Sequence, residues 1–489
     1  METTSDRGRD HDVSGPDPAA PRQRPPVLRS EPPSPRSTPP APRPGPAVLQ
    51  IGPARLTSGF DQHDRIHRAA HERIHGRPRP LGLGDLTDLA AAGSLCERDA
   101  TAFPFARKLR AVADAAADRA TRPMVVVDGT EREPGSAKDT VLLTRAPHLV
   151  LDGAVLAAGA LGAREIVVGV VDGTAAASVR RAIMERDMAA RSRVVQVSAS
   201  FLAEESGGPI RGAGYTGHAG GGDGAHSGRD VHGPGRPHGA HDGDGRPATP
   251  PGRAPGHSGG THLSALLSNP ETLAQLAALA SLGVDEYRGV GIDAEPGTVL
   301  LTVTGSARFP AVVEIPSGAP LGHLLELCGA DVGDGVLVGG YHGAWLARGA
   351  AAGAEVSRES VAAAGGVLGA GIIMPIDRRT CPLGECARVA RLLAADAARC
   401  ASCRPGLADI AAALCALAGG RAGTAALRPL REAGRLASGG FTCRHLGGLA
   451  RFAASALGVF TADVAQHLSR GTCGRPVLGL LPAHTRVRC

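Results

Sequence analysis

The sequence is poor in two kinds of residue. Aromatic side chains make up 2% of its 489 residues, and lysine occurs only as Lys108 and Lys138, so that arginine carries nearly all of the positive charge. The net charge of +6 is modest, and Asp and Glu are interspersed with Arg throughout. Surfaces that bind nucleic acid combine a concentrated basic patch with stacking aromatic residues. The sequence shows no such cluster, and it therefore does not favour a nucleic-acid partner.

The sequence also lacks the long apolar segments that direct a chain to a membrane. It contains no run of 18 or more apolar residues, which argues against a transmembrane segment. The N-terminus, METTSDRGRDHDVSG, is polar and has no apolar stretch of the kind that a secretory signal requires. We therefore expect a cytoplasmic protein, peripheral to a membrane only through a partner.

Ten cysteines are too few to form a disulfide scaffold in a chain of this length. In a reducing compartment, clustered cysteines are instead typical of metal or redox sites. Cys96, Cys328 and Cys415 each stand alone in apolar surroundings, which predicts small buried side chains. Cys473 and Cys489 are predicted to be free thiols.

Two low-complexity segments divide the chain. Residues 1–52 are rich in Pro, Arg and Ser, and residues 207–260 are rich in Gly, His and Asp. Neither segment has enough apolar residues to offset the entropy lost on folding, so we expect both to be disordered. The histidines of the second segment could capture a metal ion weakly, but its composition is more typical of a flexible insertion.

Between and after these segments, the hydrophobic pattern predicts an α/β protein with a helical C-terminal part. Strands are expected near 122–130, 165–173 and 192–200, with helices at 148–162 and 174–189, and strands that alternate with helices indicate a parallel sheet. The pattern over 297–346 is strand, strand, helix, strand, which is typical of a small β-grasp-like module. Apolar residues at 3- and 4-residue spacing then predict a helical bundle. The expected boundaries are 53–206 and 261–293 for the α/β domain, 294–350 for the β-grasp module, 351–378 for a connecting strand segment, 379–475 for the bundle and 476–489 for a tail.

The bundle contains a CxxC pair, Cys400 and Cys403, and a later Cys443 that precedes another expected helix. Such a pair can be a redox disulfide, part of a zinc site or part of an iron–sulfur site. A redox CxxC usually follows a strand and starts a helix, whereas this pair follows a helix, which disfavours the redox interpretation. Structural zinc and iron–sulfur clusters both need a fourth ligand. Position 397, where a CxxCxxC motif would have its first thiol, is Ala, so the candidate fourth ligands are Asp396, Cys386 and Cys381.

At this point several stretches resemble one family, the NADH-binding flavoprotein subunit of respiratory complex I and related hydrogenases. AARCASCRPG (397–406) is similar to the end of its S-C-G-Q-C-x-x-C-R-x-G motif, and Cys443 to its distant fourth cysteine. VVVDGTEREPGSAKD (125–139) resembles its flavin loop, and APHLVLDG (146–153) the motif that follows. LAEESGGP (202–209) and SNPETLAQL (268–276) are similar to two further motifs, and residues 302–325 resemble its soluble-ligand-binding β-grasp module. CERDATAFPFARKL (96–109) lies where the family has a glycine-rich loop.

The resemblance implies a set of cofactor-binding positions and a set of metal ligands. The positions that it implies for flavin mononucleotide (FMN) and NAD are Phe103, Lys108, Glu131, Glu133, Lys138, Glu204, Glu205, Asn269 and Thr272. The ligands that it implies for a 4Fe-4S cluster are Cys400, Cys403 and Cys443. In the family's glycine-rich loop the backbone approaches the cofactor closely, but here Glu97, Asp99 and Ala100 replace glycines. Carboxylates at these positions would repel a phosphate-bearing ligand.

Two functions are therefore expected as alternatives. The first is an iron–sulfur electron-transfer protein with a degenerate FMN/NADH pocket, which would exchange electrons with a partner subunit or a ferredoxin. The second is a catalytically inactive structural or regulatory paralogue that keeps the fold as an interaction surface. The sequence does not assign a catalytic residue, and it leaves open whether the chain is an NADH:acceptor oxidoreductase.

Overall fold

The structure of the chain is a computed structural model, which describes residues 46–99, 101–197, 265–396, 404–421, 423, 427–438 and 444–482. The segments 1–45 and 207–260, which include most of the predicted disorder, lie outside these residues. So do Glu204, Glu205 and the three cysteines predicted to bind a cluster, Cys400, Cys403 and Cys443.

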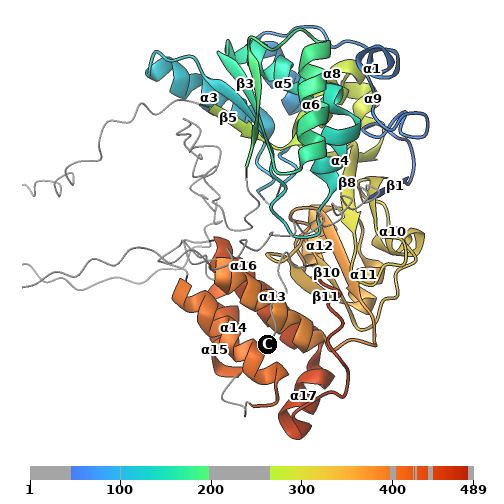
Figure 1. Cartoon of the computed structure of the whole chain (residues 1–489), viewed down its shortest axis with the longest axis vertical. Coiled ribbons are helices and arrows are strands. Elements are labelled where there is room, and N and C mark those ends of the chain that lie inside the picture. Colours follow the sequence, from blue (N-terminus) through green and yellow to red (C-terminus); the bar gives the residue numbers. More distant parts are fainter. Residues whose placement is uncertain are drawn as a thin grey trace, which may run out of the picture. The chain divides into compact units, whose positions relative to one another are not determined.

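A four-stranded parallel sheet forms the core of the first part of the chain (Figure 1). Its strand order is β4-β3-β2-β5, with β2 at Met124–Gly129, β3 at Glu165–Val170, β4 at Ser192–Gln196 and β5 at Ala265–Ser268. The central strands are continuous apolar runs, as expected for a parallel sheet that is covered on both faces. The predicted parallel α/β architecture is confirmed. The hydrophobic pattern did not predict β5, because a strand of four residues is too short to show a regular alternation of apolar and polar side chains.

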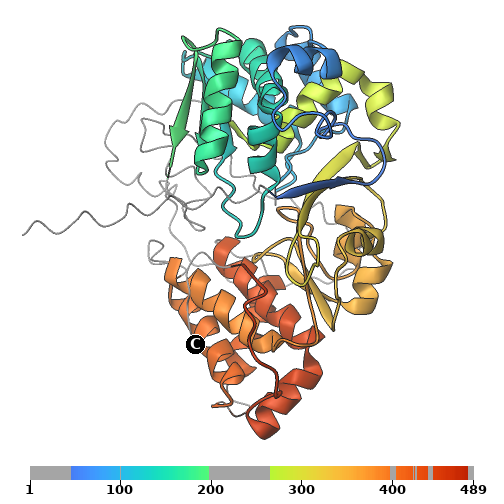
Figure 2. The ribbon, with the colours of Figure 1, turned by 45° about the vertical axis from the view of Figure 1, so that its right-hand side comes forward.

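Helices surround this sheet (Figures 1 and 2). They are α1 (Arg68–His75), α2 (Leu83–Ala92), α3 (Phe105–Asp118), α4 (Lys138–Arg145), α5 (Pro147–Leu161), α6 (Gly173–Glu185), α8 (Pro270–Leu282) and α9 (Val284–Arg288). Both α5 and α6 agree with the helices predicted at 148–162 and 174–189. The long helix α5 packs directly on α8. This contact depends on Gly153, since a Cβ atom at this position would lie 2.0 Å from the backbone oxygen of Leu273.

Replacing Gly153 with Ala is expected to lower the free energy of unfolding by about 2–4 kcal/mol, because the new methyl group would overlap the backbone of α8. The matched control is Gly159→Ala in the same helix. A Cβ atom at Gly159 would meet nothing within 4 Å, so the better helix propensity of Ala should stabilise the protein by about 0.5–1 kcal/mol. Urea denaturation of both variants measures the difference. Equal effects would show that α5 and α8 are not in the contact described.

A second, six-stranded sheet has the order β1-β9-β8-β12-β10-β11. Its strands are β1 (Ala47–Gln50), β8 (Thr298–Val303), β9 (Ala311–Pro316), β10 (Gly335–Val338), β11 (Ala344–Ala347) and β12 (Ile372–Ile376). Three helices accompany it, α10 (Leu321–Leu327), α11 (Arg348–Gly353) and α12 (Arg358–Ala363), and a small hairpin, β6 (Gly291–Ile292) with β7 (Glu295–Pro296), precedes it. The expected strand, strand, helix and strand of residues 297–346 are present, and β12 lies between β8 and β10.

The strand β1 differs from the sequence-based expectation, which placed residues 1–52 in a disordered segment. Residues 47–50 pair in parallel with β9 instead. The buried carboxylate of Glu314 on β9 then accepts hydrogen bonds from the backbone N–H groups of Arg55, Leu56 and Thr57, each at 2.9 Å, and from the Thr298 hydroxyl at 2.7 Å. This single side chain supplies partners for the backbone of residues 55–57, which follows β1.

Among the described residues, five helices form the C-terminal bundle, and they are coloured orange to red in Figures 1 and 2. They are α13 (Pro382–Asp396), α14 (Arg404–Ala418), α15 (Leu427–Ser438), α16 (Arg444–Val459) and α17 (Thr461–Arg470). The bundle joins the second sheet through the contact of α16 with β11. There the ring of Trp345 lies 4.9 Å from that of Phe460 and 6.0 Å from that of Phe452, so that some of the chain's few aromatic residues form this junction.

In the part of the chain that the structure describes, no single helix is long and apolar enough to cross a membrane. Two bent helix pairs, α4 with α5 and α16 with α17, meet the criteria of length and composition only when each pair is taken together.

Candidate functional site

Three of the sequence segments that resemble cofactor loops, 96–109, 125–139 and 268–276, meet at one edge of the first sheet. The strands β2 and β5 end there, and the helices α4 and α8 begin there. In open parallel sheets this carboxyl edge is where ligands bind. Asn269 caps α8 by accepting a hydrogen bond of 2.8 Å from the backbone N–H of Thr272, which fixes the start of that helix at the edge. The structure thus brings Lys108, Lys138, Asn269 and Thr272 together, as the resemblance implies.

A buried ion pair occupies the position of the expected glycine-rich loop. Glu97 is 1% exposed, and its carboxylate accepts a hydrogen bond of 2.7 Å from the Lys108 ammonium. The hydroxyls of Ser268 and Thr272 donate to the same carboxylate at 2.7 and 3.2 Å. Burial raises the pKa of Glu97, and the charge of Lys108 opposes this shift. The charge of this glutamate, which replaces a glycine, is therefore compensated within the protein by its ion pair with Lys108.

The neighbouring residue Arg98 ties the same loop to α8. Its backbone N–H donates to the Thr272 hydroxyl at 2.8 Å, and its carbonyl accepts from the Asn269 amide at 2.7 Å. The Lys138 ammonium also approaches this carbonyl, at 3.4 Å. Asn269 and Thr272, which the resemblance assigns to cofactor binding, are thus hydrogen-bonded to the backbone of Arg98 in this structure.

Lys138 is buried between two carboxylates. Its side chain is 3% exposed, and its Nζ atom lies 2.8 Å from the Glu271 carboxylate and 3.3 Å from that of Asp139. Burial by itself would lower the pKa of Lys138, but the charges of Asp139 and Glu271 outweigh it and raise the pKa. Glu271 also accepts a hydrogen bond of 2.9 Å from the backbone N–H of Leu300 on β8. The ion pair therefore joins α4, α8 and the second sheet.

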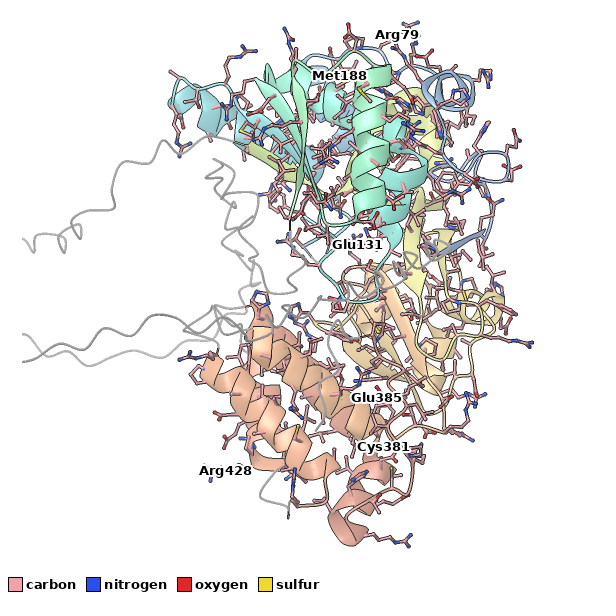
Figure 3. The ribbon with its side chains drawn as sticks, in the orientation of Figure 1. Arg79, Glu131, Met188, Cys381, Glu385 and Arg428 are labelled. Atoms are coloured by element: carbon pink, nitrogen blue, oxygen red, sulfur yellow. The ribbon has the colours of Figure 1, made fainter. Side chains whose placement is uncertain are left out.

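The flavin-loop residues Glu131 and Glu133 also make internal contacts. Glu131 accepts hydrogen bonds from the backbone N–H groups of Asp139 at 3.0 Å and Thr140 at 2.8 Å, so it caps the first turn of α4 (Figure 3). Glu133 accepts a hydrogen bond of 2.7 Å from the backbone N–H of Tyr341. Phe103 is half-buried, with the Arg107 guanidinium 5.7 Å from its ring centroid.

The carboxyl group of Glu133 gives a pH dependence that can be measured. Burial raises its pKa from 4.5 to about 8, so the folded protein keeps a proton that the unfolded chain releases. Stability is therefore lost as the pH rises from about 4.5 through about 8. Glu133→Gln keeps an acceptor for Tyr341 but does not titrate. Urea denaturation should show the variant more stable than the native chain by about 1–3 kcal/mol at about pH 9, with little difference at about pH 5. A constant difference at both pH values would contradict the assignment.

A small cavity lies beside Lys138. The cavity bounded by Arg98, Lys138, Glu271, Arg358 and the 299–301 and 368–371 segments has a volume of about 20 Å³. A volume of this size holds about one water molecule, whereas ligand pockets usually measure hundreds of cubic ångströms. Among the described residues at this edge, the Glu97 carboxylate occupies the loop that would face a flavin phosphate.

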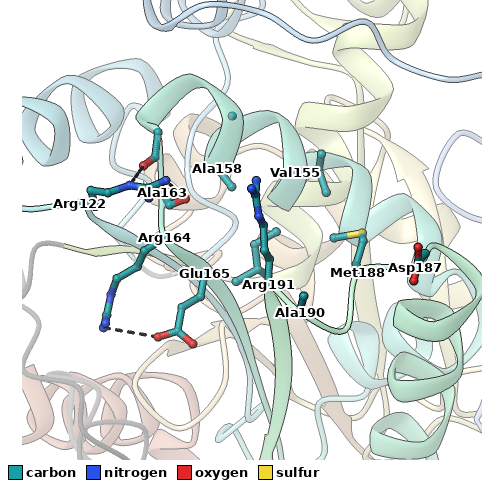
Figure 4. A pocket seen from close by; sticks show the side chains of 13 residues that line it. Arg122, Val155, Ala158, Ala163, Arg164, Glu165, Asp187, Met188, Ala190 and Arg191 are labelled. Atoms are coloured by element: carbon teal, nitrogen blue, oxygen red, sulfur yellow. Dashed lines mark hydrogen bonds and ion pairs between the residues drawn. The ribbon is translucent and has the colours of Figure 1, made fainter.

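A larger pocket, of about 470 Å³, lies at the opposite edge of the first sheet (Figure 4). It is lined at the amino ends of the strands by residues that include Arg122, Glu165 and Arg191. Arg122 donates a hydrogen bond of 3.1 Å to the carbonyl of Gly162. None of the residues predicted to bind a cofactor lines this pocket, and the amino edge of a parallel sheet is not where this fold class binds nucleotides.

The structure describes the helices that follow the predicted cluster cysteines, although the cysteines themselves lie outside the described residues. The helix α14 begins at Arg404, directly after Cys403, and α16 begins at Arg444, directly after Cys443. The first turns of these helices touch, because a Cβ atom at Gly406 would lie 2.9 Å from the Leu446 side chain. Two helix starts, each preceded by one of the cysteines, are therefore packed together.

The continuous helix α13 separates two of the predicted fourth ligands from this place. At 1.5 Å per residue, Cys386 lies about 15 Å and Cys381 about 22 Å along the helix from Asp396. Cys381 instead lies close to His467 and Cys473. Asp396, at the end of α13, remains a candidate fourth ligand by position.

The group of Cys381, His467 and Cys473 was not found from the sequence, where Cys473 was predicted to be a free thiol. Its thiol is not in a disulfide, but it lies with two other potential metal ligands. The only local signal was the spacing of six residues between His467 and Cys473, because Cys381 is distant in sequence. Among the predicted buried thiols, Cys328 is fully buried, whereas Cys96 and Cys415 are half-buried.

Comparisons with known proteins agree with the fold and the motifs. Residues 91–207 match the family described as the Nuo51 FMN-binding domain, and residues 386–467 match the NADH-ubiquinone oxidoreductase-F iron-sulfur binding region. The chain is 26% identical over 400 residues to the F 2 subunit of NADH-quinone oxidoreductase of Rhizobium meliloti (strain 1021), covering 80% of this chain and 90% of that protein. It is 25% identical over 433 residues to the F subunit of the same enzyme of Streptomyces coelicolor, covering 82% and 88%.

A solved structure has the same fold. The chain superimposes on a chain of NAD+-reducing [NiFe]-hydrogenase in the H2-reduced state with a TM-score of 0.65 and 22% identity, covering 87% of this chain and 68% of that chain. The protein therefore combines an α/β domain of the FMN-binding type with a helical domain of the iron–sulfur type. The chain is similar to the F subunit of NADH-quinone oxidoreductase, as its motifs had indicated.

Proposed function

We propose that this chain is an iron–sulfur electron-transfer subunit in which Cys400, Cys403 and Cys443 hold a 4Fe-4S cluster. The observation that carries the proposal is the packing of the first turns of α14 and α16 at Gly406 and Leu446. Because the cysteines immediately precede these helices, the packing favours a common site for their thiolates. The first N–H groups of a helix have no partner within the helix, so two adjacent helix starts are suited to stabilise a negatively charged cluster.

The cluster would supply one-electron transfer, and the protein would set its potential through nearby N–H groups and burial. Relatives of this chain are named as subunits of a quinone oxidoreductase and of a hydrogenase. We therefore propose that the redox partner is another protein, either a subunit of a larger complex or a ferredoxin.

We further propose that the FMN and NADH pocket is degenerate. The support is that the residues expected to face the cofactor are engaged within the protein. Lys108 pairs with Glu97, and Lys138 with Glu271 and Asp139. A phosphate entering this edge would have to separate a lysine from a buried carboxylate, which is costly.

The same ion pairs support a second candidate function. If no cluster is bound, the chain is a redox-silent paralogue whose retained fold serves as an interaction surface in a complex. The two candidates differ in their cofactor content and not in their fold.

Purification of the full-length chain without oxygen tests both candidates. Iron, acid-labile sulfide and flavin are measured on the same sample, together with absorbance spectra before and after dithionite. The first candidate predicts about four irons and four sulfides per chain, a reducible visible band and little flavin. A colourless protein without iron would leave only the second candidate. Stoichiometric flavin that NADH bleaches would contradict the degenerate pocket.

A further inference from the structure

Three potential metal ligands meet at one end of the helical bundle. Cys381 directly precedes α13, His467 lies in the last turn of α17, and Cys473 follows that helix. One ligand atom from each residue lies within 4.8 Å of those of the other two. Figure 3 shows Cys381 near the start of α13, beside α17. Cys381 and His467 are each 3% exposed, so the group is largely enclosed by protein.

The distance between the first two ligands suits a shared metal ion. The Cys381 Sγ atom lies 3.3 Å from the His467 Nε2 atom. In a tetrahedral zinc site, bonds of about 2.3 Å to sulfur and about 2.0–2.1 Å to nitrogen place these two atoms about 3.5 Å apart. The Sγ atom also accepts a hydrogen bond of 3.3 Å from the backbone N–H of Gly384 in the first turn of α13, which fixes its position.

The imidazole of His467 is oriented as in many metal sites. Its Nε2 atom faces the thiol, while its Nδ1 atom is buried without a well-formed hydrogen bond. The backbone carbonyls of Leu417 and Ala418, at the end of α14, interact with the same ring. Histidines that bind metal usually direct the second ring nitrogen at a carbonyl or carboxylate, which leaves the first nitrogen free to coordinate.

The segment that carries Cys473 is held against α13 by Glu385. The Glu385 side chain is fully buried and accepts hydrogen bonds from the backbone N–H groups of Gly479, Leu480 and Leu481. The backbone N–H of Cys381 donates to the Pro476 carbonyl at 2.7 Å. These bonds fix the chain on the far side of Cys473, and α17 fixes it on the near side, so the three ligands are positioned in advance.

The charges around the group also suit a dication. Asp463, one turn before His467 on α17, forms an ion pair with Arg475. Two thiolates with a neutral imidazole would balance the charge of Zn²⁺, and the adjacent ion pair adds no net charge. Thiolate and imidazole ligands favour zinc over the oxygen-binding ions Mg²⁺ and Ca²⁺.

We propose that Cys381, His467 and Cys473 bind one zinc ion, with the fourth position taken by water or an exogenous ligand. This site is separate from the iron–sulfur site proposed above, since it lies at the opposite end of α13. Its ligands come from the start of α13, from α17 and from the following segment. The ion therefore fastens the end of the described chain to the bundle.

The test uses the full-length chain, purified with a reductant from cells grown with added zinc and then dialysed against a weak chelator. Elemental analysis should find about one zinc per chain. Cys473→Ser, in a half-buried segment after α17, and Cys381→Ser should each lower zinc affinity at least about tenfold in a competition titration. Replacement of zinc by Co²⁺ should give a thiolate-to-cobalt absorption band that Cys473→Ser loses.

Two control variants identify the site. Cys328→Ser changes a buried thiol in the second sheet region, and Cys403→Ser changes a proposed cluster ligand, so both should keep their zinc. Zinc lost from Cys403→Ser but kept by Cys473→Ser would place the ion elsewhere and overturn the proposal. So would a wild-type chain that binds neither zinc nor cobalt, or a Cys381–Cys473 disulfide found by mass spectrometry in the reduced preparation. Because zinc and iron are measured separately, failure of this site is distinguishable from absence of the cluster.

Discussion

Replacing Cys403 with Ser is expected to remove most of the iron from the chain purified without oxygen. Cys403 belongs to the CxxC motif and immediately precedes α14, whose first turn contacts that of α16. With Ala397 in place of a fourth thiol, only three cysteine ligands are expected, so the loss of one leaves too few to retain a cluster. Iron per chain should fall at least about fivefold, and the visible absorbance with it.

The matched control is Cys415→Ser. Cys415 lies within α14, and its Sγ atom is 3.9 Å from the carbonyl of Ala387 on α13, so it is placed between helices and not at their starts. This variant should keep its iron. Equal iron in the two variants would reject the ligand assignment, and thermal melts of both would show whether the bundle has stayed folded.

Replacing Lys138 with Met is expected to lower the free energy of unfolding by about 3–5 kcal/mol. The substitution keeps the side-chain length but leaves Glu271 and Asp139 without their buried cation, and uncompensated buried carboxylates carry this cost. Urea denaturation at about pH 8 measures the loss. At lower pH the loss should shrink, because burial raises the pKa of Asp139 to about 7 and protonation removes part of the uncompensated charge.

Two further variants distinguish a structural lysine from a cofactor-binding lysine. The double substitution Lys138→Met with Glu271→Gln should recover part of the lost stability, because it removes the second charge of the pair. Lys108→Met should cost less, since Lys108 is 26% exposed and its partner Glu97 keeps hydroxyl donors from Ser268 and Thr272. If Lys138→Met left stability unchanged and abolished flavin binding, the lysine would serve a cofactor and the degenerate pocket would be wrong.

The sequence predicted the architecture because the relevant signals are local. The apolar runs of β2 and β3 and the helical periodicity of α5 and α6 each repeat within a few residues. The strand β1 gave no such signal, because its order depends on pairing with β9 and on Glu314, more than 250 residues away. Likewise, the motif ending in Gly153 was recognisable, but its role as the contact point of two helices became evident only from the packing.

The candidate sites likewise combine features that the sequence shows with features that only the tertiary structure shows. The sequence singled out the two lysines and the Cys400, Cys403 and Cys443 pattern, because rare residues and short spacings can be read directly along a chain. Only the tertiary structure paired Lys108 with Glu97 and Lys138 with Glu271. It also brought Cys381 to His467 and Cys473, since α13 runs away from Cys381 and the chain returns only after α17.

The sequence by itself thus determined the fold class, the family resemblance and the place of the expected cluster. The tertiary structure decided which charges neutralise each other at the edge of the first sheet and which thiols share a site at the end of the bundle. The physical reason is distance along the chain. Ion pairs and metal ligands form between atoms a few ångströms apart, whatever their separation in sequence, and only the folded chain sets those distances.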